Sequence, residues 1–167
     1  MGITWIKYPV MFVTVVLIQV LLLNQIQFSG FVNPYLYLLF ILLLPVSMAR
    51  YQVLLLSFLL GLTIDVFSNT PGIHAAATVF AGFLRSPLIG RLSGRESEIN
   101  DYPGLKQNGM RWFVLYTAVM VILHHFFLFY VEVFTLSRFF ATFFRSLASS
   151  VFTIFMIVLS QFLIFRD

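Results

Sequence analysis

The sequence has no cysteine and few charged residues. Without cysteine the chain can form no disulfide, no thiolate metal site and no cysteine nucleophile. Charged residues make up 10% of the chain and hydrophobic residues 60%, whereas soluble domains carry about 25% charged residues. So few charges cannot cover a water-soluble domain of 167 residues. The surface must face lipid instead, which predicts an integral membrane protein in contact with the bilayer.

Catalytic motifs are also absent from the sequence. It holds no Walker loop, no G-x-S-x-G, no H-E-x-x-H and no dinucleotide fingerprint. The ionisable side chains expected at membrane depth are Asp65, His124, His125 and Arg145. This set is too sparse for acid–base or phosphate chemistry, so we predict no enzyme, no cofactor and no metal site. An enzyme acting on lipid is a further alternative, but the sequence shows no set of catalytic residues for it.

Ten basic and six acidic residues give a formal charge of +4. The basic residues form no stripe of the kind that binds nucleic acid. We therefore predict no nucleic-acid partner. In membrane proteins, Lys and Arg collect in cytoplasmic loops and set the orientation. Placing the N-terminus in the cytoplasm leaves only Arg138 and Arg145 on the outer side. We therefore expect both termini to be cytoplasmic and the outer loops to be short.

Six long hydrophobic runs predict the fold. A bilayer core about 30 Å thick needs about 20 helical residues, and these runs are continuously apolar, unlike the alternating strands of barrels. We predict a single all-α transmembrane domain over residues 1–167, a bundle of about six helices whose first run is not cleaved. The second run is short and contains Pro45, so five helices are the alternative. The expected helices are 9–26, 35–49, 51–67, 73–89, 112–131 and 139–165, and the cytoplasmic loop is 90–111.

Asp65 is the ionisable residue whose position most needs a reason. It lies about 21 Å along its helix, and Arg145 lies about 9 Å into the last helix from the outer side. These depths are comparable, so we hypothesise an Asp65–Arg145 ion pair within the membrane. Glu132 is the second candidate: it is a possible intramembrane partner of Asp65, and it also competes with Asp65 for Arg145. The alternative is that Arg145 simply extends to the membrane interface.

His124 and His125 are adjacent in the fifth predicted helix. Neighbouring positions differ by about 100° around a helix, so the two imidazoles are poorly placed to bind one metal ion. We expect interhelical hydrogen bonds to Ser, Thr or backbone groups. A proton-relay or metal role is the alternative.

Residues 61–84, GLTIDVFSNTPGIHAAATVFAGFL, resemble the signature of the rod shape-determining protein MreD family. The matching positions are Gly61, Asp65 and Gly72, followed by Ala75. The chain length and the hydrophobic runs extend the resemblance over nearly the whole chain. Further similarities are Asn33-Pro34 ahead of the second run and Glu132 at the end of the fifth.

The resemblance implies a non-catalytic scaffold of the bacterial inner membrane that acts in cell elongation, rod shape and side-wall peptidoglycan synthesis. The implied partners are an MreC-like bitopic protein and, through it, MreB-like filaments, a RodA-like glycosyltransferase and its transpeptidase. Arg91, Arg95 and Lys106 would then offer a cytoplasmic contact, although anionic lipid explains these charges equally well. The family is similar in architecture to the substrate-binding subunits of energy-coupling-factor transporters. This similarity supplies the alternative function, a vitamin-binding subunit of a membrane transporter.

Overall fold

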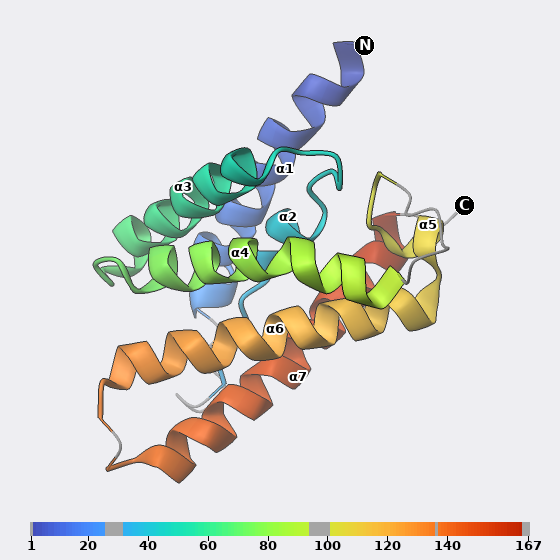
Figure 1. Cartoon of the computed structure of the whole chain (residues 1–167). Coiled ribbons are helices and arrows are strands. Elements are labelled where there is room, and N and C mark those ends of the chain that lie inside the picture. The colour runs from blue at the N-terminus through green and yellow to red at the C-terminus, as the bar shows by residue number, and fades with distance from the viewer. Residues whose placement is uncertain (1, 26–31, 94–100, 136, 165–167) are drawn as a thin grey trace.

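Five long helices form the bundle in the computed structural model of the chain (Figure 1). They are long and apolar enough to cross a membrane. The structure describes residues 2–25, 32–93, 101–135 and 137–164, and these ranges contain no β-strand. The expected all-helical fold is therefore confirmed, and it is compatible with a multi-pass membrane protein. The long helices are α1 (Gly2–Leu21), α3 (Arg50–Ser68), α4 (Ile73–Ser93), α6 (Met110–Val133) and α7 (Phe139–Ile164).

The predicted second transmembrane helix, residues 35–49, is wrong. Only α2 (Leu38–Leu42) is α-helical there, and every residue from 35 to 44 is buried. We call residues 32–49 the crossing segment, because they run through the buried centre of the bundle and lead into α3. An irregular backbone is tolerated at membrane depth where protein surrounds it. The other short elements are η1 (Leu23–Gln25) and α5 (Leu105–Asn108).

Side chains of the long helices satisfy the polar backbone of the crossing segment. The Tyr35 N–H donates to Thr153 Oγ1 at 3.0 Å, and the Leu42 carbonyl accepts from the Tyr116 hydroxyl at 3.2 Å. At the far end of the segment, the Arg85 guanidinium donates to the Leu44 carbonyl. These bonds replace the intrahelical bonds that a regular spanning helix would supply. The segment can therefore remain irregular while it is buried.

The long helices pack as antiparallel neighbours, α3 beside α4 and α6 beside α7, with α4 also against α6 (Figure 1). We call the end where α3 turns into α4 and α6 into α7 the hairpin end. The opposite end is the basic end, where the Lys7 ammonium lies 3.7 Å from the centre of the Tyr102 ring. The Ser47 N–H donates to Asp101 there at 2.8 Å. Basic residues gather at this end: Lys7, Arg50, Arg85, Arg91, Lys106 and Arg111.

Candidate functional site

Gly61 lies where α3 packs directly against the backbone of α4. A Cβ at this position would meet Ala75 Cα at 2.5 Å and the His74 carbonyl oxygen at 2.6 Å. Because these are backbone atoms, a larger residue would have to push the two helices apart. Gly82 makes a similar close contact from α4, where an added Cβ would meet the Ser57 hydroxyl. Small residues thus allow α3 and α4 to approach closely, as in many membrane helix pairs.

Asp65 holds the same two helices together by a different contact. Its side chain is 4% exposed. One carboxylate oxygen accepts from the His74 N–H and the Thr70 hydroxyl, and the other accepts from the Ala75 N–H, each at 2.9 Å. The first N–H groups of a helix have no intrahelical acceptor. A carboxylate at this place satisfies them and complements the positive end of the helix dipole. Asp65 in α3 therefore caps the N-terminus of α4.

Gly72 completes the turn between the two helices. Its φ of +83° lies in the left-handed region, which costs glycine much less than other residues. An added Cβ would meet nothing within 4 Å, so backbone conformation and not space is the constraint at this position. Gly61, Asp65 and Gly72, the residues that carry the family resemblance, thus all shape the α3–α4 hairpin.

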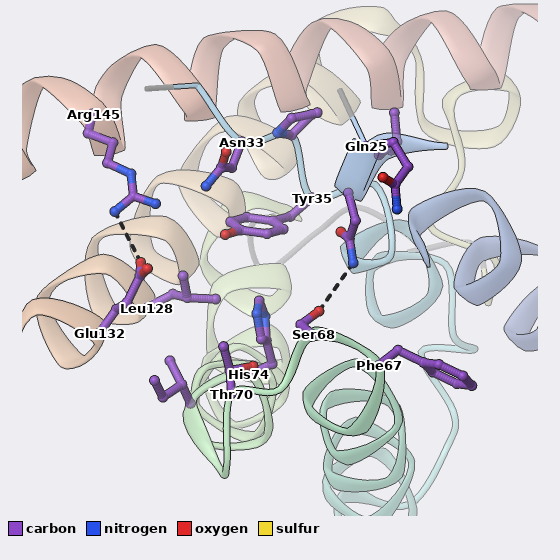
Figure 2. A pocket seen from close by; sticks show the side chains of 14 residues that line it. Gln25, Asn33, Tyr35, Phe67, Ser68, Thr70, His74, Leu128, Glu132 and Arg145 are labelled. Atoms are coloured by element: carbon purple, nitrogen blue, oxygen red, sulfur yellow. Dashed lines mark hydrogen bonds and ion pairs between the residues drawn. The ribbon is translucent and has the colours of Figure 1, made fainter. Parts of the chain in front are cut away.

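The predicted Asp65–Arg145 ion pair is wrong, because among the described residues Asp65 forms no ion pair or hydrogen bond with Arg145 or Glu132. The Arg145 guanidinium pairs instead with Glu132, with Nη1 and Oε2 3.2 Å apart (Figure 2). Among the described residues this is the only ion pair. The reason is that the carboxylate of Asp65 is already occupied by donors from the turn that follows it. Glu132 was named as the competing partner for Arg145, and that pairing is confirmed.

Buried histidines and a tyrosine form a continuous polar chain in the bundle centre, which we call the histidine network. The Tyr37 hydroxyl lies 2.8 Å from His74 Nδ1 and 3.2 Å from His124 Nε2. His124 Nδ1 lies 3.4 Å from His125 Nδ1, and His125 Nε2 lies 3.0 Å from Thr153 Oγ1. The expected hydrogen bond between a histidine and a hydroxyl of another helix is therefore confirmed. Within the part of the chain that the structure describes, no group of three or more acidic or histidine side chains is placed to hold a metal ion.

A cavity of about 400 Å³ opens at the hairpin end. Figure 2 shows Arg145 and Asn33 on one side of it, Ser68 and Thr70 on the other, and the Tyr35 ring between them. The lining includes one cation, Arg145, and one anion, Glu132, together with amide, hydroxyl and imidazole groups. Such walls can hold a small polar molecule or water.

Sequence reasoning missed the histidine network and the cavity. It placed Tyr35 and Tyr37 in a membrane-spanning helix over residues 35–49 and assigned no role to His74. One signal was available, because Asn33 was noted as a family similarity and it lines the cavity. With its amide oriented to suit its neighbours, Asn33 accepts a hydrogen bond from Arg145 at 2.8 Å.

Two of the three predicted cytoplasmic contact residues are found at the basic end. Arg91, in the last turn of α4, and Lys106, in α5, are both exposed. Arg95 lies outside the described residues. The structure thus leaves Arg91 and Lys106 accessible to a lipid surface or a partner.

Comparison with known proteins found no relative of this chain. No family model, no curated protein and no solved structure matches the chain. Function must therefore be argued from the residues and their geometry.

Proposed function

We propose that this protein is a non-catalytic scaffold of the bacterial inner membrane that resembles the MreD family and acts in cell elongation. The observation that supports this most is the role of Gly61, Asp65 and Gly72. These residues carry the resemblance, and each shapes the α3–α4 hairpin. A motif that sets helix geometry and leaves no acid–base group free suits a protein whose task is to present a defined surface. It does not suit an enzyme, in which a signature motif would supply reactive groups.

The outward surfaces of the long helices are the proposed contact area for partners. They are apolar, with large exposed side chains such as Leu55, Val66, Val151 and Phe155. The described connection between α3 and α4 at the hairpin end is short, residues 69–72. We propose an MreC-like bitopic protein as the direct partner. Through it the scaffold would connect to MreB-like filaments, a RodA-like glycosyltransferase and its transpeptidase.

The gathering of basic residues supports a cytoplasmic location for the basic end, because Lys and Arg collect on that side of a membrane. α1 begins at this end and α7 finishes there, so both termini would be cytoplasmic. Arg91 and Lys106 would then face anionic lipid headgroups or a filament at the inner surface. The hairpin end, with its cavity, would face the opposite side.

Affinity purification from membranes of the native host tests the scaffold. The tagged full chain should recover an MreC-like protein with a single membrane span, identified by mass spectrometry. Gly61→Val, which separates α3 from α4, should lower that recovery, whereas Gly90→Ala should not, because an added Cβ there meets nothing within 4 Å. Recovery of no bitopic partner with the wild-type chain would refute the scaffold role.

The second candidate function is a small-molecule binding subunit of a transporter. It is favoured by one observation, the polar cavity of about 400 Å³ at the hairpin end, which is within the usual volume range of ligand sites. Purified protein can be denatured and the released small molecules identified by mass spectrometry. A vitamin recovered at close to one molecule per chain would replace the scaffold proposal, and its absence would leave the scaffold preferred.

A further inference from the structure

A second pocket, at the basic end, is lined by two arginines and, among the residues that the structure describes, by no acidic residue. It encloses about 260 Å³ between the end of the crossing segment, the start of α3 and the last turns of α4. Its charged and polar lining consists of Arg50, Arg85 and Ser86. The remaining lining is apolar or glycine: Val46, Met48, Val53, Gly82, Ile89 and Gly90. The pocket therefore carries positive charge with no compensating charge in its wall.

Arg85 is buried without an anionic partner. It is 2% exposed, and its guanidinium donates to the Leu44 carbonyl and, at 3.4 Å, to the Pro45 carbonyl. Its Nε is buried with no hydrogen-bond partner, and it forms no ion pair with any described residue. A buried guanidinium is costly unless it is paired with an anion. Carbonyl groups orient this side chain, and no described acidic residue forms an ion pair with it.

The neighbouring acidic residue does not supply a counterion inside the pocket. Asp101 lies close enough for its charge to interact with Arg85, but it does not line the pocket. Its carboxylate accepts the Ser47 N–H at 2.8 Å. Among the described residues, the lining of the pocket thus carries only positive charge.

Arg50 adds a second guanidinium from the adjacent helix. It is the first residue of α3, it is exposed, and its guanidinium carbon lies 4.5 Å from the centre of the Phe83 ring. This contact holds the side chain against α4, beside the pocket. The start of a spanning helix lies near the headgroup layer of a bilayer. The N-terminus of α3 also contributes the positive end of its dipole.

We propose that this pocket binds the phosphate group of an anionic phospholipid from the leaflet at the basic end. Guanidinium groups match phosphate oxygens in geometry and charge, and basic pockets between membrane helices on the cytoplasmic side are known to take anionic headgroups. The apolar lining beside the arginines suits the start of the acyl chains. A choline headgroup brings its own positive charge against the arginines and binds less well. The inference does not depend on the scaffold role.

Native mass spectrometry of the full chain released from nanodiscs tests this site. The discs contain phosphatidylcholine with a minor fraction of phosphatidylglycerol, and the readout is the phosphatidylglycerol that stays bound. Arg50→Gln should reduce the retained phosphatidylglycerol roughly fivefold, since one basic residue at a membrane surface contributes about 1 kcal/mol. Arg91→Gln is the matched control, because Arg91 is an exposed arginine in the last turn of α4 that does not line the pocket. It should reduce retention clearly less than Arg50→Gln does.

Arg85→Met, which keeps much of the side-chain length but not the charge, should abolish the retention. Thermal melting shows whether this variant folds. If it does not fold, the retention measured for Arg50→Gln tests the site instead. Equal losses in Arg50→Gln and Arg91→Gln would indicate general surface attraction and would overturn the site. A parallel arm adds inorganic phosphate to discs of phosphatidylcholine alone. If inorganic phosphate binds and phosphatidylglycerol is not retained, the lipid is not the ligand and the proposal is overturned.

Discussion

Replacing Asp65 by alanine should destabilise the protein strongly, because one carboxylate serves three donors. The substitution leaves the N–H groups of His74 and Ala75 and the Thr70 hydroxyl without an acceptor. An unsatisfied buried donor costs about 1–3 kcal/mol, and loss of a helix cap costs about 0.5–2 kcal/mol. Thr70 and His74 also line the cavity, where water can replace part of the loss. We therefore expect the free energy of unfolding to fall by about 2–4 kcal/mol.

Two milder substitutions calibrate this value. Asp65→Asn keeps one accepting oxygen but loses the charge and one acceptor, and it should cost about 1–2 kcal/mol. Thr70→Val removes only one donor and its bond, and it should cost about 1 kcal/mol or less. The expected order of stability is wild type, Thr70→Val, Asp65→Asn, Asp65→Ala. Reversible unfolding of the purified chain in mixed detergent micelles measures each value.

A double-mutant cycle with Arg145 separates helix capping from an ion pair. Arg145 pairs with Glu132 and not with Asp65, so Asp65→Ala and Arg145→Ala should be additive within about 0.5 kcal/mol. A coupling energy well above that value would show that the two charges interact. Wild-type stability of Asp65→Asn would likewise refute the capping argument.

Three further predictions test other parts of the structure. Gly61→Ala should lower the free energy of unfolding by about 1–3 kcal/mol through overpacking against α4, whereas Gly90→Ala should raise it by about 0.5–1 kcal/mol. Equal melting temperatures of the two variants would contradict the close contact. Thr153→Val should cost about 1–3 kcal/mol, because His125 and a backbone N–H of the crossing segment lose their partner, and hydrogen exchange in that segment should accelerate. Hydrogen bonds from Ser47 lower the pKa of Asp101, so its contribution to stability is present above the unfolded-chain pKa and is lost as the pH falls through the folded pKa. Melting temperatures measured downward from about pH 5 should therefore fall less steeply in Asp101→Asn than in the wild type.

The sequence alone predicted the all-helical class and the five long apolar helices that the structure shows. Hydropathy is a local property summed over about 20 residues, so it predicts spans without knowledge of their neighbours. The helices expected at 51–67 and 139–165 are observed as Arg50–Ser68 and Phe139–Ile164. Gly61 and Gly72 were singled out by the resemblance to the MreD family alone, whereas Asp65 also stood out as an ionisable residue at membrane depth.

Only the tertiary structure decided the course of the crossing segment and the partners of the buried polar groups. Burial in protein and burial in lipid select the same apolar side chains, so the hydropathy of residues 35–49 could not distinguish the two. The difference lies in whether neighbouring helices satisfy the backbone, as Thr153 and Arg85 do. The ion pair was misassigned for a related reason. The similar depths of Asp65 and Arg145 along their helices suggested a contact. The packing of the helices instead pairs Arg145 with Glu132, and Asp65 accepts hydrogen bonds from the backbone of α4.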